Sequence, residues 1–170
     1  MHVLDCVQMS TAEIQTEVLL CIGGQRQNGI TSTGEVYDPA SDSWHSVAPM
    51  STERRQAEAA TWNGKVVVAG GYDSQRVTLK STEQYDAETN QWTAFRSLLT
   101  ARAGHALVNA DNTLFAIGGW DYRGNSNSVE RYNTKSGVWQ EAPPLQIPRS
   151  DFASATLRVC YSARFILFLT

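Results

Sequence analysis

The middle of the chain contains the run Val66-Val67-Val68-Ala69-Gly70-Gly71, in which four apolar residues precede two glycines. Two similar runs are Leu19-Leu20-Cys21-Ile22-Gly23-Gly24 and Leu114-Phe115-Ala116-Ile117-Gly118-Gly119. The diglycines begin at 23, 70 and 118, so their spacings are 47 and 48 residues. A period of this length is typical of proteins built from structural repeats, and it therefore governs how the rest of the sequence is divided.

Further landmarks recur at fixed distances within each copy. A Glu-x-Tyr triplet follows each diglycine, a tryptophan lies nine residues after the glutamate, and an arginine lies ten residues after the tryptophan. The glutamates are Glu35, Glu83 and Glu130, the tyrosines Tyr37, Tyr85 and Tyr132, the tryptophans Trp44, Trp92 and Trp139, and the arginines Arg54, Arg102 and Arg149. The shared spacing indicates three copies of one unit.

Each copy is predicted to form four short strands. A run of small residues follows the arginine, then come the diglycine run, the Glu-x-Tyr segment and the tryptophan segment. Turn-forming residues separate these segments, for example Asn63-Gly64 between the first two strands of the middle copy and residues 38–42 between the last two of the first copy. The pattern predicts an all-β meander.

A four-stranded unit with diglycine, Glu-x-Tyr and tryptophan landmarks resembles the kelch repeat of β-propellers, and the phrasing from Glu35 to Met50 resembles the kelch-like, or BTB-kelch, branch. The resemblance implies a partial kelch β-propeller of three full four-stranded blades plus an incomplete one. The expected divisions are a divergent segment 1–17, repeats at 18–50, 51–98 and 99–145, the start of a further repeat at 146–157, and a divergent tail 158–170. Residues 1–17 carry neither the arginine nor the small-residue strand expected of a first copy.

The repeated residues are expected to be scaffold rather than site. Glycine pairs supply positive-φ backbone and close approach, and aromatic residues supply large apolar area between blades. These blade landmarks are Gly23, Gly24, Tyr37, Trp44, Gly70, Gly71, Tyr85, Trp92, Gly118, Gly119, Tyr132 and Trp139.

Composition excludes several classes of protein. The net charge of −3 gives no electrostatic footprint for nucleic acid, and no stretch approaches the roughly 20 apolar residues of a membrane span. The start of the chain lacks a basic region followed by an apolar run, so no secretory signal is expected. The three cysteines form no CxxC pair, which fits free thiols in a reducing, cytoplasmic setting.

A meander sends alternate loops to one face, so loops 25–33, 72–81 and 120–127 are expected beside loops 51–55, 99–102 and 147–150. In kelch-like proteins this face holds partner peptides, and arginine suits acidic ligands because its planar fork bonds a carboxylate twice. The resemblance therefore gives as ligand-face candidates Arg26, Arg55, Tyr72, Arg76, Arg102, Tyr122, Arg123, Arg149 and Ser150.

The resemblance implies a protein–protein interaction module, similar to the substrate-recognition propeller of kelch-like adaptors for cullin-RING ubiquitin ligases. The expected partner is a protein or peptide with an acidic or phosphorylated segment, and a cullin ligase would be reached only through a BTB domain, which the sequence does not show. An actin-binding or other cytoskeletal kelch protein is the alternative. A kelch-fold enzyme, an oxidase or epimerase, is a weaker one, because the three histidines occupy different repeat positions. No catalytic residue, metal or cofactor is therefore expected.

Overall fold

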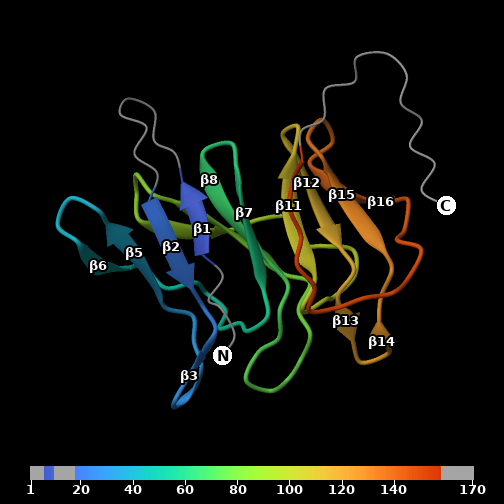
Figure 1. The fold of residues 1–170 in the computed structure, drawn as a ribbon, viewed down its shortest axis with the longest axis horizontal. Coiled ribbons are helices and arrows are strands. Elements are labelled where there is room, and N and C mark those ends of the chain that lie inside the picture. The colour runs from blue at the N-terminus through green and yellow to red at the C-terminus, as the bar shows by residue number, and fades with distance from the viewer. Residues whose placement is uncertain (1–5, 10–17, 158–170) are drawn as a thin grey trace.

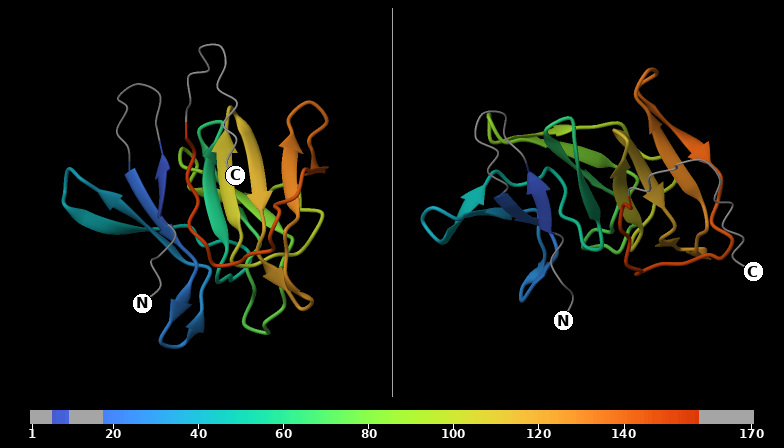
Figure 2. Two further views of the ribbon diagram at one scale, coloured as in Figure 1. Left: turned by 45° about the vertical axis from the view of Figure 1, so that its right-hand side comes forward. Right: turned by 45° about the horizontal axis from the view of Figure 1, so that its top comes forward.

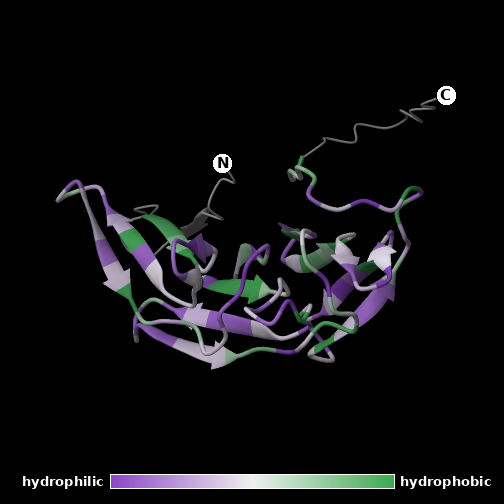
Figure 3. Ribbon diagram, turned by 90° about the horizontal axis from the view of Figure 1, so that it is seen from below, coloured by the Kyte–Doolittle hydropathy of each residue, from purple (hydrophilic) through white to green (hydrophobic). Residues whose placement is uncertain are grey.

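The computed structural model describes residues 6–9 and 18–157, and within these ranges every regular element is a β-strand. Three four-stranded sheets follow one another along the chain, as blades 1, 2 and 3, and lie side by side along an arc (Figures 1 and 3). The expected all-β kelch propeller arc with three four-stranded blades is confirmed. No helix in the described ranges is long and apolar enough to cross a membrane.

The strands of each blade are consecutive in sequence apart from short hairpins. Blade 1 contains β1 (Cys6–Met9), β2 (Val18–Ile22), β5 (Gly34–Asp38) and β6 (Ser43–Val47). Blade 2 contains β7 (Glu58–Trp62), β8 (Lys65–Ala69), β9 (Thr82–Asp86) and β10 (Gln91–Ala94). Blade 3 contains β11 (Ala106–Ala110), β12 (Thr113–Ile117), β15 (Val129–Asn133) and β16 (Val138–Ala142). All neighbouring strands are antiparallel, as in a meander.

Strand β8 is buried on both faces because its blade lies between the other two. Val66 and Val68 point into a cluster shared with Leu20 and Ile22 of blade 1. Their neighbours on β8 point the other way, into a cluster shared with blade 3. Successive side chains of a strand alternate between faces, so one strand serves both inter-blade cores.

The aromatic landmarks join adjacent blades. Tyr85 lies opposite Trp92 in the register of blade 2, and their ring centroids are 5.0 Å apart. The Trp92 indole N–H donates to the Ala48 carbonyl of blade 1 at 2.8 Å, and the Trp139 indole donates to the Arg96 carbonyl of blade 2 at 2.7 Å. Trp92 and Trp139 therefore each pack on the tyrosine of their own blade and bond to the preceding blade.

The two ends of the arc differ from the sequence expectation. Strand β1 occupies the inner position of blade 1, although segment 1–17 lacks the small-residue pattern expected for that strand. A strand can join a sheet through backbone hydrogen bonds alone, which the side-chain pattern does not reveal. Residues 146–157, expected to begin a further copy, contain no strand. The expected tail 158–170 lies outside the described residues.

Candidate functional site

Loops from all three blades gather on one face of the arc, at the same end of each blade. The hairpin of β3 (Gln25–Arg26) and β4 (Gly29–Ile30), the loop 72–81, and the hairpin of β13 (Trp120–Asp121) and β14 (Gly124–Asn125) project from it (Figures 1 and 2). The turn between β15 and β16, which contains Lys135, lies at the opposite end of its blade (Figure 1). We call the first of these ends the loop face.

Backbone hydrogen bonds join the inter-blade linkers to the loops of the loop face. Arg55 and Tyr72 exchange two N–H to carbonyl bonds of 2.9 Å each. Ala103 and Trp120 exchange the equivalent pair at 3.0 and 2.8 Å. Side chains from two chain segments are thereby held in fixed relative positions at each junction, on backbone that is tied to the sheets.

Two aromatic rings from neighbouring blades meet on the loop face. The centroids of Tyr72 and Trp120, from different blades, are 5.7 Å apart. Beside them, the Arg55 guanidinium donates to the Gln25 side-chain oxygen at 2.8 Å, which links blades 1 and 2. Trp120 and Gln25 were not among the sequence candidates, although Trp120 follows the third diglycine at the repeat position where Tyr72 follows the second.

Arg102 does not belong to the loop face, and the prediction that it contacts a ligand is wrong. Only 1% of its side chain is exposed, because the guanidinium lies inside blade 3. It donates to the Gly118 carbonyl at 2.6 Å and to the Glu130 carboxylate at 2.7 Å. A buried arginine whose charge is already paired cannot meet an external carboxylate.

Arg54 occupies the same place in blade 2. It donates to the Gly70 carbonyl at 2.8 Å and to the Glu83 carboxylate at 2.9 Å. Burial lowers the pKa of Arg54, and the hydrogen bond and charge of Glu83 act in the opposite direction. Glu83 and Glu130 were not predicted to form ion pairs, although the matched spacing of the repeated arginines and glutamates was the signal that could have paired them.

The hairpin β13–β14 presents the most exposed aromatic side chain of the loop face. Tyr122 is 83% exposed. The Arg123 guanidinium carbon lies 5.1 Å from the Tyr122 ring centroid, and its Nε donates to the Tyr122 hydroxyl oxygen at 2.8 Å. This hydrogen bond, then the charges of Tyr122 and Asp121, raise the pKa of Arg123. The remaining N–H groups of this planar cation have no partner among the described residues.

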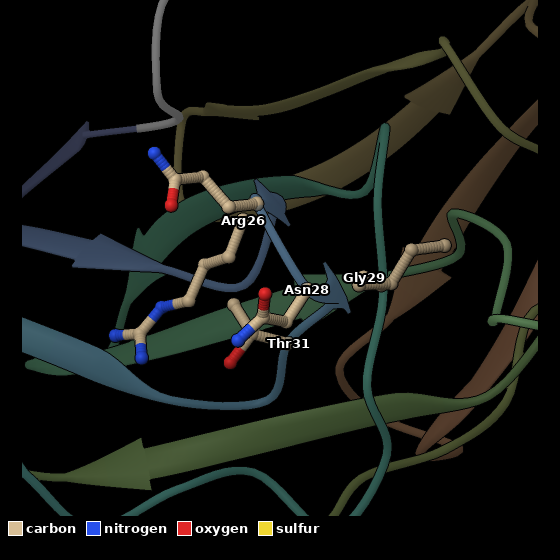
Figure 4. Close-up of a pocket in the computed structure, with 6 residues that line it drawn as sticks. Arg26, Asn28, Gly29 and Thr31 are labelled. Carbon is tan, nitrogen blue, oxygen red and sulfur yellow. The ribbon is translucent and has the colours of Figure 1, made fainter.

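The hairpin β3–β4 borders a shallow surface hollow lined by residues 26–31 (Figure 4). Arg26 lies on it and is exposed. Arg76 is also exposed, and it adopts a positive φ of 61° in the turn that begins at Asp73. Both arginines are therefore open to solvent on loops of the same face.

The third linker carries the last two candidates. The Ser150 hydroxyl donates to the Asn125 side-chain oxygen at 3.0 Å, which ties this linker to the hairpin β13–β14. Arg149 is exposed, and its guanidinium has no partner among the described residues. The loops that carry the candidates other than Arg102 thus lie on the loop face, and contacts join two pairs of candidates, Arg55 with Tyr72 and Tyr122 with Arg123.

The loop face carries exposed arginines as well as carboxylates that accept local hydrogen bonds. Asp73 accepts them from the backbone amides of Gln75 and Val77, and Asp121 accepts one from the Arg123 amide. Asp151 accepts one from the Gln56 side-chain amide. Arg26, Arg76, Arg123 and Arg149 make no ion pair within the described ranges. No group of three or more histidine, cysteine, aspartate or glutamate side chains that could hold a metal occurs in those ranges either.

Antiparallel four-stranded blades that follow one another around an arc, with their loops gathered at one end, define the β-propeller class of protein. Residues 8–168 match the family described as the KLHDC2/KLHL20/DRC7 Kelch-repeats domain. The chain belongs to the kelch-repeat family.

Known proteins similar to the chain include two kinds of relative and one solved structure. Beta-scruin of Limulus polyphemus is 32% identical over 124 residues, which is 69% of this chain and 14% of beta-scruin. Kelch-like protein 36 of Bos taurus is 29% identical over 142 residues, which is 79% of this chain and 23% of that protein. The structure of YjhT matches with a TM-score of 0.65 at 16% identity, over 84% of this chain and 52% of that one. The chain spans less than a quarter of these two curated relatives.

Proposed function

We propose that the loop face binds an acidic or phosphorylated segment of another protein. The observation that carries the proposal is the set of arginines without ion pairs on the same face as the Tyr72 and Trp120 rings, whose centroids lie 5.7 Å apart. Arginine forks bond carboxylate or phosphate groups through parallel hydrogen bonds, and aromatic rings provide apolar contact area for the intervening residues. The chain as a whole has a net charge of −3, so binding of an acidic segment would depend on the arginines of this face.

The similarity to Kelch-like protein 36 supports a protein ligand and, more narrowly, the recognition of a substrate for a cullin-RING ubiquitin ligase. In the kelch-like branch the ligase is reached through a BTB domain, so this role concerns the repeats as one part of such a protein. The cytoplasmic location expected from the sequence stays a prediction. Actin is the alternative partner. An enzymatic role would require that the protein is observed to turn over a substrate.

The test is binding of fluorescent peptide pools, measured by anisotropy. A pool rich in glutamate and phosphoserine is expected to bind more tightly than a pool in which these residues are replaced by glutamine and serine. The double variant Arg55→Glu with Arg123→Glu should weaken binding of the acidic pool by at least about tenfold, since each reversal replaces an attraction by a repulsion. The variant Lys135→Glu, on the opposite end, is the matched control and should bind as the unchanged protein does.

Equal binding of the two pools, or equal losses from the loop-face and Lys135 variants, would overturn the proposal. Sedimentation with actin filaments is the second measurement. Pelleting that the Arg55 and Arg123 reversals abolish would assign the same face to actin instead.

A further inference from the structure

A buried ion pair and backbone amide contacts join each of the two linkers between described blades to the blade that follows it. We call this arrangement the ionic clamp. In blade 3 the Glu130 carboxylate accepts the backbone amides of Leu99 and Thr100 at 2.7 and 3.0 Å, in addition to the Arg102 guanidinium. In blade 2 the Glu83 carboxylate accepts the amides of Ser51 and Thr52 and the Arg54 guanidinium. The repeated geometry shows that linker, arginine and glutamate act as one unit.

The first blade contains the glutamate of this clamp, Glu35, but no arginine of the described residues is paired with it. Glu35 lies opposite Cys21, two residues before Gly23, in the register that places Glu83 opposite Val68 and Glu130 opposite Ala116. Its side chain is exposed and has no hydrogen-bond or ion-pair partner among the described residues. Glu83 and Glu130, by contrast, are 3% and 2% exposed.

Other acceptors of the clamp are also in place in blade 1. The hydroxyls of Ser81 and Ser128 accept hydrogen bonds from Arg54 and Arg102, and Thr33 supplies a hydroxyl at the same repeat position. The Gly23 amide donates to the Thr33 carbonyl, as the Gly70 amide does to the Ser81 carbonyl. Blade 1 is therefore shaped to accept an arginine.

The third linker contains the donor half. The Gly119 amide donates to the Arg149 carbonyl at 2.8 Å, as the Gly71 amide does to the Arg102 carbonyl at 2.9 Å. The Arg149 backbone thus holds the position of a clamp arginine while its guanidinium remains exposed without a partner in the described ranges. By repeat position, the amides of Gln146 and Ile147 correspond to those of Leu99 and Thr100.

The tryptophan hydrogen bond between blades also has its donor in blade 1 and its acceptor after blade 3. Trp92 and Trp139 donate to the carbonyl four residues after the tryptophan of the preceding blade. Trp44 has no preceding blade in the described arc and is 46% exposed. The carbonyl in the matching position after Trp139 belongs to Pro143.

We propose that two copies of this chain join head to tail at both ends, so that Arg149 of each enters the Glu35 half-site of the other. Trp44 of each copy then donates to the Pro143 carbonyl of the other. Two three-bladed arcs make a closed ring of six blades, which lies within the four to eight blades that propellers use. The match of this chain to 52% of the YjhT chain fits an arc of about half a propeller. Closure also covers the blade faces that an open arc exposes at its two ends.

The assembly requires an exchange at the inner edge of β2. Ala153 follows Arg149 by four residues, as Glu58 follows Arg54 and Ala106 follows Arg102, and those two residues begin β7 and β11. Residues 153–157 contain no strand and are exposed. In the ring, this segment of one copy takes the place of β1 beside β2 of the other, which is a strand exchange between identical chains.

Light scattering after size exclusion tests the proposal with the full chain. The unchanged protein should have the mass of two copies. The variants Glu35→Arg and Arg149→Glu should each dissociate at least about tenfold more readily, because each places like charges in the clamp. An equimolar mixture of the two variants should recover more of the two-copy mass than either variant alone, since Arg149 again meets Glu35 at one of its two junctions.

Arg123→Glu is the matched control, because it reverses an exposed loop arginine outside the clamp and should keep the two-copy mass. Thermal melts of each variant show whether it folds. A monomeric unchanged protein, masses that grow beyond two copies with concentration, or a mixture that fails to recover would each overturn the proposal. None of these outcomes depends on the peptide binding proposed for the loop face.

Discussion

The Arg102 guanidinium donates to the Glu130 carboxylate at 2.7 Å, and 1% and 2% of these side chains are exposed. Arg54 and Glu83 form the same contact in blade 2 at 2.9 Å. Because the glutamates also accept linker amides, the pairs fix the path of the chain from one blade to the next. The two buried ion pairs of the described residues are therefore structural.

Replacing one member of the buried pair is expected to be costly. Arg102→Met leaves the Glu130 carboxylate buried without its cation, and we expect a loss of about 3–5 kcal/mol in the free energy of unfolding. Chemical denaturation measures it. Arg123→Met removes an exposed arginine and should change stability by less than about 0.5 kcal/mol. Similar losses in the two variants would contradict the structural role of the pair.

The inter-blade tryptophans give a second, graded prediction. Trp139 is 3% exposed and packs in the cluster between blades 2 and 3, so Trp139→Ala should cost about 3–5 kcal/mol. Trp92 is only partly buried, and Trp92→Ala should cost less. Val138→Ala, beside Trp139 on β16 and 41% exposed, is the control and should cost below about 1 kcal/mol. Urea unfolding measures the loss in the free energy of unfolding for each variant. A larger loss for Trp92→Ala than for Trp139→Ala would contradict the prediction.

The sequence predicted the fold well because its landmarks are set by packing that every blade repeats. Tyr85 with Trp92 and Tyr132 with Trp139 must meet wherever two adjacent strands and a neighbouring blade are built in the same way. The position of β1 could not be predicted in this way, since its pairing with β2 depends on backbone hydrogen bonds and not on a side-chain signature.

The candidate site was harder to predict because one repeat position supports two environments. Arg102 and Arg149 occupy the same place in the repeat, yet Arg102 is buried by blade 3 while Arg149 is exposed. Arg54 and Arg55 are adjacent, and the one that turns inward is the one aligned with a glutamate two strands away. Sequence spacing identifies residue types at a position, whereas burial depends on whether the next blade covers it.

The diglycines allow a test of close approach. Gly70 has a positive φ of 62°, and a Cβ there would collide with the Arg102 carbonyl oxygen. Gly64 has a similar φ of 71° with nothing within 4 Å of its Cβ position. Gly64→Ala should therefore lower the free energy of unfolding only through its strained backbone conformation, by about 1–2 kcal/mol. Gly70→Ala should lower it by a further amount of about 1–3 kcal/mol, because the new methyl group overpacks the site. Equal melting temperatures for the two variants would show that the carbonyl moves aside at little cost.

His105 is expected to make stability depend on pH. Burial, followed by the nearby charge of Arg102, lowers the pKa of His105 to about 3. Neither ring nitrogen has a hydrogen-bond partner among the described residues. The folded chain therefore holds His105 neutral, whereas an unfolded histidine takes up a proton below a pKa of about 6.5.

The direction of the effect follows from this difference. Below pH 6.5 the unfolded chain binds a proton at this residue that the folded chain does not bind, so the free energy of unfolding falls as the pH falls. The loss is absent above pH 6.5 and complete near pH 3. Well inside this window the unfolding constant should rise by about tenfold for each pH unit from His105 alone. Urea unfolding between pH 6.5 and 5 isolates the effect, because ordinary carboxylates titrate around pH 4.

His105→Leu removes the titrating group and should flatten the dependence between pH 6.5 and 5, whatever its stability at pH 7. His45→Gln is the matched control, because His45 lies on β6 with an exposed side chain and should leave the slope as it is. A slope that survives in His105→Leu but disappears in His45→Gln would place the proton uptake on the outer strand of blade 1. The pH dependence would then no longer report the close packing of His105 against Gly70 and Gly119 at the junction of blades 2 and 3.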